Sequence, residues 1–193
     1  MAQAARTVIA RADRPVAARY AIVAVAGAHG VMVSVMAMTP IHLIHEGATL
    51  EIVGLTISLH VLGMYALSPV FGILADRAGR VPTILIGQLL LAAALLTAAL
   101  GQDSQAAVTV ALVLLGLGWS ASTVAGSALL TEASSEDRRT KRQGRNDLTM
   151  NLVGSIGAIL AGLVLTLIGY GGLALCALAI VGVVTALAPL GRR

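Results

Sequence analysis

The most informative absence in this sequence is charge within its long apolar stretches. Only 11% of the 193 residues are charged, whereas about a quarter of an average soluble domain is. None of the 13 Lys and Arg residues falls within residues 20–76, 81–137 or 146–191. Hydrophobic residues make up 58% of the chain, and its mean hydropathy is +0.91. Water is therefore excluded as the main solvent of the fold, and we expect a membrane protein.

Scarce residue types narrow the function further. The single cysteine, Cys176, lies in an apolar stretch, which excludes an intrachain disulfide and a cysteine metal cluster. We expect neither a metal site nor a cofactor. The pI of about 10.0 would ordinarily suggest a nucleic-acid partner, but only one Phe and one Trp are present to stack on bases. Membrane topology explains the basic residues instead, and we expect no nucleic-acid partner.

Six apolar stretches are long enough to cross a bilayer, which takes roughly 20 mainly apolar residues. With short loops they use nearly all of the chain, so no soluble domain fits beside them. The sequence thus predicts an all-α membrane protein embedded in the lipid bilayer. The expected spans are residues 19–43, 50–75, 83–100, 107–131, 147–169 and 173–190.

The positions of the basic residues predict the topology. All 13 Lys and Arg residues lie in the N-terminal tail, the second and fourth loops and the C-terminus, which share one side of the membrane if there are six spans. The charges of the other three loops are Glu46, Glu51 and Asp103. The positive-inside rule then places both termini in the cytoplasm and the protein in the cell membrane. An Arg-rich start also faintly resembles a transit peptide, but a cytoplasmic tail is favoured. The expected parts are a cytoplasmic tail at residues 1–18, a transmembrane domain at 19–190 and a cytoplasmic C-terminus at 191–193.

Polar residues are unevenly distributed among the spans. The first, second, fourth and fifth carry several, whereas the third and the sixth are nearly apolar. Because lipid cannot satisfy polar groups, we expect the polar spans to line a cavity and the other two to support them from outside. Gly118, Ser122 and Gly126 recur at a spacing that lets a neighbouring helix backbone approach closely. The candidates for a substrate or proton pathway are His29, Met36, His60, Met64, Trp119 and Asn151.

Several candidate residues have open alternatives. His60 lies in mid-span, where an ionisable residue indicates function by default, but a neutral, hydrogen-bonded packing histidine fits equally well. Met36 suits an adaptable apolar pocket, although core or lipid contact is more common at its spacing. Asp147, with Asn146, opens the expected fifth span. That position favours N-capping and is compatible with a gating contact.

Residues 72–82 form a short charged segment between the second and third spans, Gly-Ile-Leu-Ala-Asp-Arg-Ala-Gly-Arg-Val-Pro. Asp76 ends a helix, where the helix dipole disfavours a negative charge, so we expect it to find an Arg or the N-terminus of another helix. Arg77 and Arg80 are expected to pair with an acid, and Glu132, which closes the fourth span on the same side, is the candidate. The positive-inside rule alone explains two arginines but not this order of residues.

This segment resembles the conserved loop motif of the major facilitator superfamily, which joins the second and third helices of a six-helix half. The resemblance implies that Gly72 is a helix contact, while Gly79 permits a tight turn. Val and Pro follow Arg80, where the family often has another basic residue. The resemblance also implies a cytoplasmic gating latch at Asp76, Arg77, Gly79 and Arg80.

The resemblance covers essentially the whole chain after residue 18 and implies one half of a transporter, built from two inverted three-helix units. Residues 36–42, 57–65 and 143–147 are similar to the C-terminal half of bacterial, drug-efflux-like members. The Gly-Pro signature of antiporters, expected on the fifth helix of an N-terminal half, is missing. The implied function is secondary transport, as proton-coupled efflux of a small-molecule substrate. The implied partner is a second six-helix unit, either another copy or a separately encoded N-terminal half.

Two other functional classes compete with transport. A chain that corresponds to half a transporter also fits a gene remnant or an accessory membrane subunit without transport activity of its own. Gly118-Trp119-Ser120 faintly resembles an intramembrane serine protease, whose histidine base comes from the sixth helix. That chemistry needs a histidine base within hydrogen-bond reach of the serine, and every histidine here lies in the first two spans or the loop between them, with none in the sixth span. We therefore expect no enzymatic activity and no catalytic residue.

Overall fold

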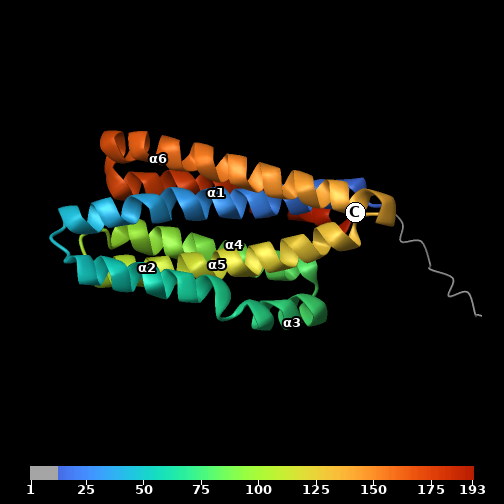
Figure 1. Ribbon diagram of the computed structural model, residues 1–193, viewed down its shortest axis with the longest axis horizontal. Coiled ribbons are helices and arrows are strands. Elements are labelled where there is room, and N and C mark those ends of the chain that lie inside the picture. Colours follow the sequence, from blue (N-terminus) through green and yellow to red (C-terminus); the bar gives the residue numbers. More distant parts are fainter. Residues whose placement is uncertain (1–12) are drawn as a thin grey trace, which may run out of the picture.

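The computed structural model describes residues 13–193, which form helices and turns without any strand (Figure 1). The expected all-α membrane class is confirmed. Residues 1–12, most of the expected N-terminal tail, lie outside the described residues. In chain order the elements are α1 (Pro15–His45), α2 (Leu50–Tyr65), α3 (Ser68–Ala78), α4 (Arg80–Leu100), α5 (Gln105–Glu132), α6 (Glu136–Ala186) and the 3-10 helix η1 (Ala188–Arg192).

The expectation of six separate membrane helices is wrong in its count. Five helical elements are long and apolar enough to cross a membrane, because the expected fifth and sixth spans are continuous as α6. Gly169, with φ 74° and ψ −179°, interrupts α6, and the chain reverses there, as the orange and red ribbon of Figure 1 shows. A side chain would disfavour this positive φ. Gly169 thus separates a first leg of α6 (136–168) from a second leg (170–186), and the chain still runs along the bundle six times.

Two further boundaries differ from the sequence prediction. The second expected span is divided into α2 and α3, because Pro69 lacks the N–H that would continue α2. α6 begins at Glu136 rather than at residue 147, with Ser135 at the N-cap position. Asp147 therefore lies inside α6, and the prediction that it caps a helix is wrong. Ser135 precedes two acidic residues in the first turn, where negative charge favours a helix start.

Close helix approaches determine the order of the bundle. α1 packs between α5 and α6, and α5 also packs against α2 and α4. A Cβ added to Gly118 would lie 2.8 Å from the carbonyl oxygen of Gly87 on α4, which confirms the predicted approach there. Gly126 instead faces Val25 of α1. The first leg of α6, α1, α5 and α2 thus form a row of neighbouring helices, with α4 packed against α5 and α6.

Charge divides the two ends of the bundle. One end holds the start of α1, the junction of α3 and α4, the first turns of α6 and the C-terminus, which carry all the described Lys and Arg residues. We call it the basic end; it lies at the right of Figure 1. The opposite end holds Glu46, Glu51 and Asp103 together with the α6 reversal, and we call it the acidic end.

Candidate functional site

The charged segment at residues 72–82 is held by one arginine. Arg80 donates from Nε and Nη2 to Oε1 of Glu132 on α5, at 3.0 and 2.7 Å. Its Nη1 lies 2.6 Å from Oδ1 of Asp76 at the end of α3. The expected pairing of Arg80 with Glu132 is therefore present. Arg77 is exposed and forms no ion pair within residues 13–193.

Of the two carboxylates that bind Arg80, only that of Asp76 is largely exposed to solvent. Arg80 and Glu132 are 20% and 27% exposed at their side chains, whereas Asp76 is 68% exposed. Gly79 has a φ of 100°, so the expected tight turn is present. A Cβ at Gly72 would meet no atom within 4 Å, so Gly72 approaches no helix within the described residues. Asp76 and Gly72 are both open to a contact from outside this unit.

A second cluster at the basic end ties the start of α1 to the start of α6. Asp13 accepts from Nη1 and Nη2 of Arg142 at 2.6 and 3.0 Å, and from Nη1 of Arg138 at 3.1 Å. The backbone N–H of Ser135 donates to it at 3.2 Å. The hydrogen bond from Arg142, above all, holds the pKa of Asp13 below its ordinary value. The sequence did not reveal this contact, because Asp13 falls within the stretch expected to be a tail.

Two predicted residues lie on α6 away from both clusters. Asp147 is exposed, and its Oδ1 accepts from Nδ2 of Asn146 at 3.4 Å. Asn151, also exposed, donates from Nδ2 to the backbone oxygen of Asp147 at 2.8 Å. Within residues 13–193 neither side chain bonds to Arg80 or Glu132. The gating role of Asp147 and the pathway role of Asn151 therefore stay predictions.

Three rings from three helices meet at mid-span. Trp119 of α5 lies between His29 of α1 and Tyr65 of α2, with ring centroids 6.2 and 6.0 Å away. Tyr65 is 60% exposed, and the other two are half-buried. Gly154 of α6 packs against His29, where an added Cβ would lie 2.8 Å from ring atom Cδ2. We call His29, Trp119 and Tyr65 the ring cluster. Sequence reasoning missed Tyr65, because nothing in the sequence shows that α2 places it beside Trp119.

The contact between Trp119 and His29 determines which histidine nitrogen carries the proton. Nε1 of Trp119 lies 3.2 Å from Nδ1 of His29, and an indole N–H can only donate a hydrogen bond. Nδ1 must therefore present a lone pair, and the proton of the neutral imidazole is on Nε2. A second proton, on Nδ1, would break this hydrogen bond, because both nitrogens would then be donors.

The other predicted pathway residues are packed more deeply. His60 is fully buried, and its Nδ1 donates to the carbonyl oxygen of Leu112 at 2.7 Å. This is the arrangement that the packing alternative for His60 describes. Met64, 8% exposed, belongs to the core, and the half-buried Met36 packs against the same core. Their roles in a pathway stay predictions.

Comparison with known proteins identifies the family. The sequence model of the Major Facilitator Superfamily matches residues 20–192. Two uncharacterized MFS-type transporters of Bacillus subtilis (strain 168), YddS and YdeG, are 40% and 39% identical to this chain over 141 and 146 residues. These matches cover 72% and 75% of this chain but only 32% and 34% of the relatives.

A third relative is the riboflavin transporter RfnT of Brucella anthropi, 32% identical over 122 residues, which are 63% of this chain and 30% of the relative. The chain thus spans about a third of the length of the curated relatives it matches. The family match extends over nearly all of the described helices, from α1 to η1. Together with the all-helical membrane fold and the charged segment between α3 and α4, it shows that the chain belongs to the Major Facilitator Superfamily.

Proposed function

We propose that this chain is one half of a secondary transporter which, with a second unit of the same kind, moves small organic molecules across the cell membrane. The positive-inside rule favours a basic end in the cytoplasm. The observation that carries the proposal is the ring cluster. The ring cluster lies at mid-span, where polar groups such as the His29 imidazole and the Trp119 N–H are costly against lipid. Between two facing units, the same groups would line a cavity at the bilayer midplane.

Proton coupling is supported by the hydrogen bond between Trp119 and His29. Because His29 accepts this bond only as a neutral imidazole, the uptake of a proton would release the indole from α1. The wall of the cavity would then differ between the protonated and the neutral state of His29. Coupling of proton movement to substrate movement requires such a difference between two states. We infer that His29, rather than the buried His60, carries the coupled proton. Efflux is the direction that the drug-efflux-like segments favour.

The gate of the proposed transporter lies at Asp76, Arg80 and Glu132. Arg80 is shared between the two carboxylates, so one unit of negative charge remains in the cluster. The exposed Asp76 is placed to bind the positive N-terminus of a helix in the second unit. Formation of that contact would close the basic end, and its loss would open it.

Planar aromatic molecules are the substrate class that the ring cluster favours. Tyr65 and Trp119 meet at an interplanar angle of 75°, and aromatic groups pack well against such rings in stacked or edge arrangements. The relative RfnT is named as a riboflavin transporter, and riboflavin contains a planar ring system. Riboflavin is therefore the first substrate to test, beside amphiphilic dyes.

A flux measurement in membrane vesicles tests the proposal. Vesicles that carry the chain, alone or with a second facilitator unit, are loaded with riboflavin or a dye, and fluorescence is followed after a pH gradient is imposed. We expect flux that depends on the gradient and is lost in Trp119→Ala. Flux that a protonophore leaves unchanged would exclude proton coupling. Correct membrane insertion without flux in any combination would favour the accessory subunit or gene remnant.

A further inference from the structure

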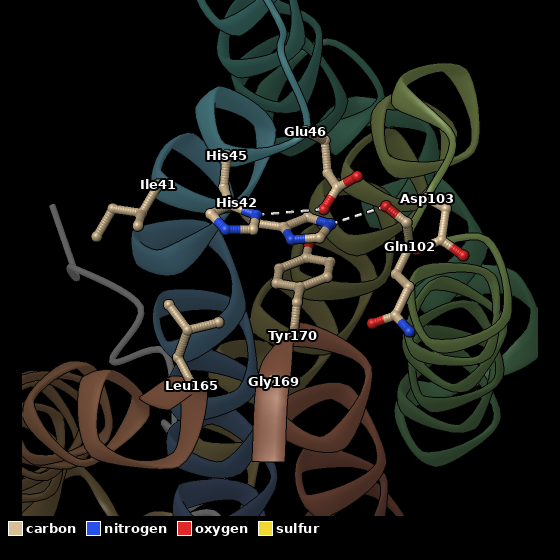
Figure 2. Close-up of a pocket in the computed structure, with 9 residues that line it drawn as sticks. All are labelled: Ile41, His42, His45, Glu46, Gln102, Asp103, Leu165, Gly169 and Tyr170. Carbon is tan, nitrogen blue, oxygen red and sulfur yellow. Dashed lines mark hydrogen bonds and ion pairs between the residues drawn. The ribbon is translucent and has the colours of Figure 1, made fainter. Parts of the chain in front are cut away.

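A pocket at the acidic end lies apart from the ring cluster (Figure 2). Its volume is about 370 Å³, and its wall comes from the end of α1, the loop between α4 and α5, and the reversal of α6. None of its lining residues belongs to α2 or α5, which carry Tyr65 and Trp119. The pocket is therefore distinct from the proposed transport face, and its properties do not depend on transport.

The pocket is built on two stacked rings. His42 and Tyr170 have ring centroids 4.2 Å apart and an interplanar angle of 6°, and Figure 2 shows the two rings stacked on each other. His42 is only 9% exposed, and its Nε2 lies 2.8 Å from the carbonyl oxygen of Gln102. The Tyr170 hydroxyl lies 2.9 Å from that of Thr39, and the N–H of Gly171 donates to Oε1 of Gln102 at 2.9 Å. These bonds join all three segments of the wall, so its shape is fixed before any ligand binds.

The polar atoms that remain in this wall are mainly hydrogen-bond acceptors. A carbonyl oxygen only accepts, so the bonded Nε2 of His42 carries the proton, and Nδ1 presents a lone pair with no partner among residues 13–193. The carboxylates of Glu46 and Asp103 also line the pocket, and an ionised carboxylate only accepts. His45 lines it as well, and its Nδ1 lies 3.4 Å from Oε1 of Glu46, so Oε2 of Glu46 and the carboxylate of Asp103 are the carboxylate acceptors left without a partner among residues 13–193. Gln102, whose side-chain oxygen is engaged, contributes an amide donor. A ligand that fits this wall must itself donate several hydrogen bonds.

The charge at this end favours a cation over a neutral donor. Glu46, Glu51 and Asp103 lie here, and no Lys or Arg occurs in residues 20–76 or 81–137. A metal ion is not supported, because in the described part of the chain no three His, Cys, Asp or Glu side chains are grouped so that they could hold one. An ammonium group can be held by two acceptors, so it does not need such a group of three.

We propose that this pocket binds a small alkylammonium ion. Its ammonium group would donate to the carboxylate of Glu46 and to Nδ1 of His42, which are charge-assisted hydrogen bonds, and the negative charge of Asp103 at the same end would attract it. Its alkyl chain would pack on Ile41 and Leu165, the apolar part of the wall. Figure 2 shows these apolar side chains on one side of the stacked rings and Asp103 on the other.

Ligand-observed NMR on the full chain in nanodiscs of zwitterionic lipid tests this proposal. The probe is n-butylammonium at pH 7.5, and 1-butanol is its neutral isostere. We expect saturable binding of n-butylammonium and a Kd at least about tenfold higher for 1-butanol, which lacks the charge. Glu46→Gln should raise the Kd of n-butylammonium about tenfold, and Asp103→Asn, which removes only an attracting charge, should raise it by a smaller factor. Both carboxylates are solvent-accessible, so these variants should fold.

Two further variants separate the pocket from the general surface. Glu51→Gln removes an exposed carboxylate at the same end that does not line the pocket, and it should leave the Kd unchanged. Leu165→Trp fills the pocket without altering its charge and should abolish binding. Equal binding of 1-butanol, an equal loss in Glu51→Gln, or unchanged binding in Leu165→Trp would each overturn the proposal. Transport activity is not part of this readout, so a failed flux assay leaves the result standing.

Discussion

The guanidinium of Arg80 and the carboxylate of Glu132 join the start of α4 to the end of α5 through two hydrogen bonds of 3.0 and 2.7 Å. Asp76 binds the same guanidinium from the end of α3. The two carboxylates differ in exposure, 27% for Glu132 and 68% for Asp76. This difference separates a contact that stabilises the unit from one that is accessible to a partner, and the two can be tested independently.

Asp76→Asn should abolish substrate flux while leaving membrane insertion and thermal stability nearly unchanged. The exposed ion pair with Arg80 contributes at most about 1 kcal/mol to stability, but the loss of negative charge removes the contact proposed with a helix N-terminus. Vesicle flux and the midpoint of thermal unfolding are measured side by side. Wild-type flux in this variant would remove Asp76 from the gate.

Glu132→Gln should instead lower the stability of the unit. It replaces a carboxylate that accepts two hydrogen bonds from Arg80, and hydrogen bonds to charged groups contribute about 1.5–3 kcal/mol when they are buried, less at this partial exposure. We expect a lower unfolding midpoint for the purified chain in detergent than for Asp76→Asn. Equal midpoints in the two variants would show that the Glu132 contact is not the stronger one.

His29→Gln should remove the pH dependence of transport. Glutamine can still accept a hydrogen bond from Trp119 through its amide oxygen, so the cavity wall is kept while the titrating group is lost. Substrate exchange without a pH gradient should continue, and gradient-driven flux should stop. The matched control is His60→Gln, which changes a buried histidine bonded to the Leu112 carbonyl. If His60→Gln flattens the pH profile and His29→Gln does not, His60 carries the proton.

The contacts of Asp13 with Arg142 and Ser135 attach the start of α1 to α6, and we expect this attachment to weaken in acid. The pKa of Asp13 lies below the ordinary value of 3.8, so the contact with Arg142 contributes stability that is fully present above that value and is lost as the pH falls through the lowered pKa. Hydrogen exchange at Ser135, whose N–H donates to Asp13, should be faster in Asp13→Asn than in wild type at pH 6. The difference should shrink as the pH is lowered below 3.8 and Asp13 takes up a proton. A difference that is constant with pH would show that the Asp13 charge is not responsible.

The sequence predicted the positions of the helices well, because an apolar stretch long enough to cross a bilayer has few alternatives to a transmembrane helix. The turn at Gly79 and the end of the fifth span at Gly169 were also predicted, and both have a positive φ. The division between α2 and α3 and the early start of α6 were missed. Their signals, Pro69 and the Ser135-Glu-Asp cap, were present in the sequence but lay inside or beside stretches already explained by hydropathy and charge.

The two binding surfaces could not be predicted in the same way. The ring cluster and the stacked pair of His42 and Tyr170 both join helices that are distant in sequence. Hydropathy determines that these helices exist but not which of their faces meet. Arg80 and Glu132 were an exception, because both stand at helix ends on the same side of the membrane, where topology alone brings opposite charges together.

The last prediction concerns the second unit. If the ring cluster lines a cavity, the exposed side of α2 near Tyr65 faces a partner, and Leu62, one turn earlier and 58% exposed, lies close to it. Leu62→Cys in a Cys176→Ala background should cross-link in membranes, as a dimer of this chain or to a separate unit. The matched control is Leu89→Cys, 70% exposed on α4, the helix that packs against α5 and α6; it should face lipid and stay uncross-linked. Equal cross-linking at both positions would indicate random collision, and transport by a demonstrated monomer would overturn the need for a partner.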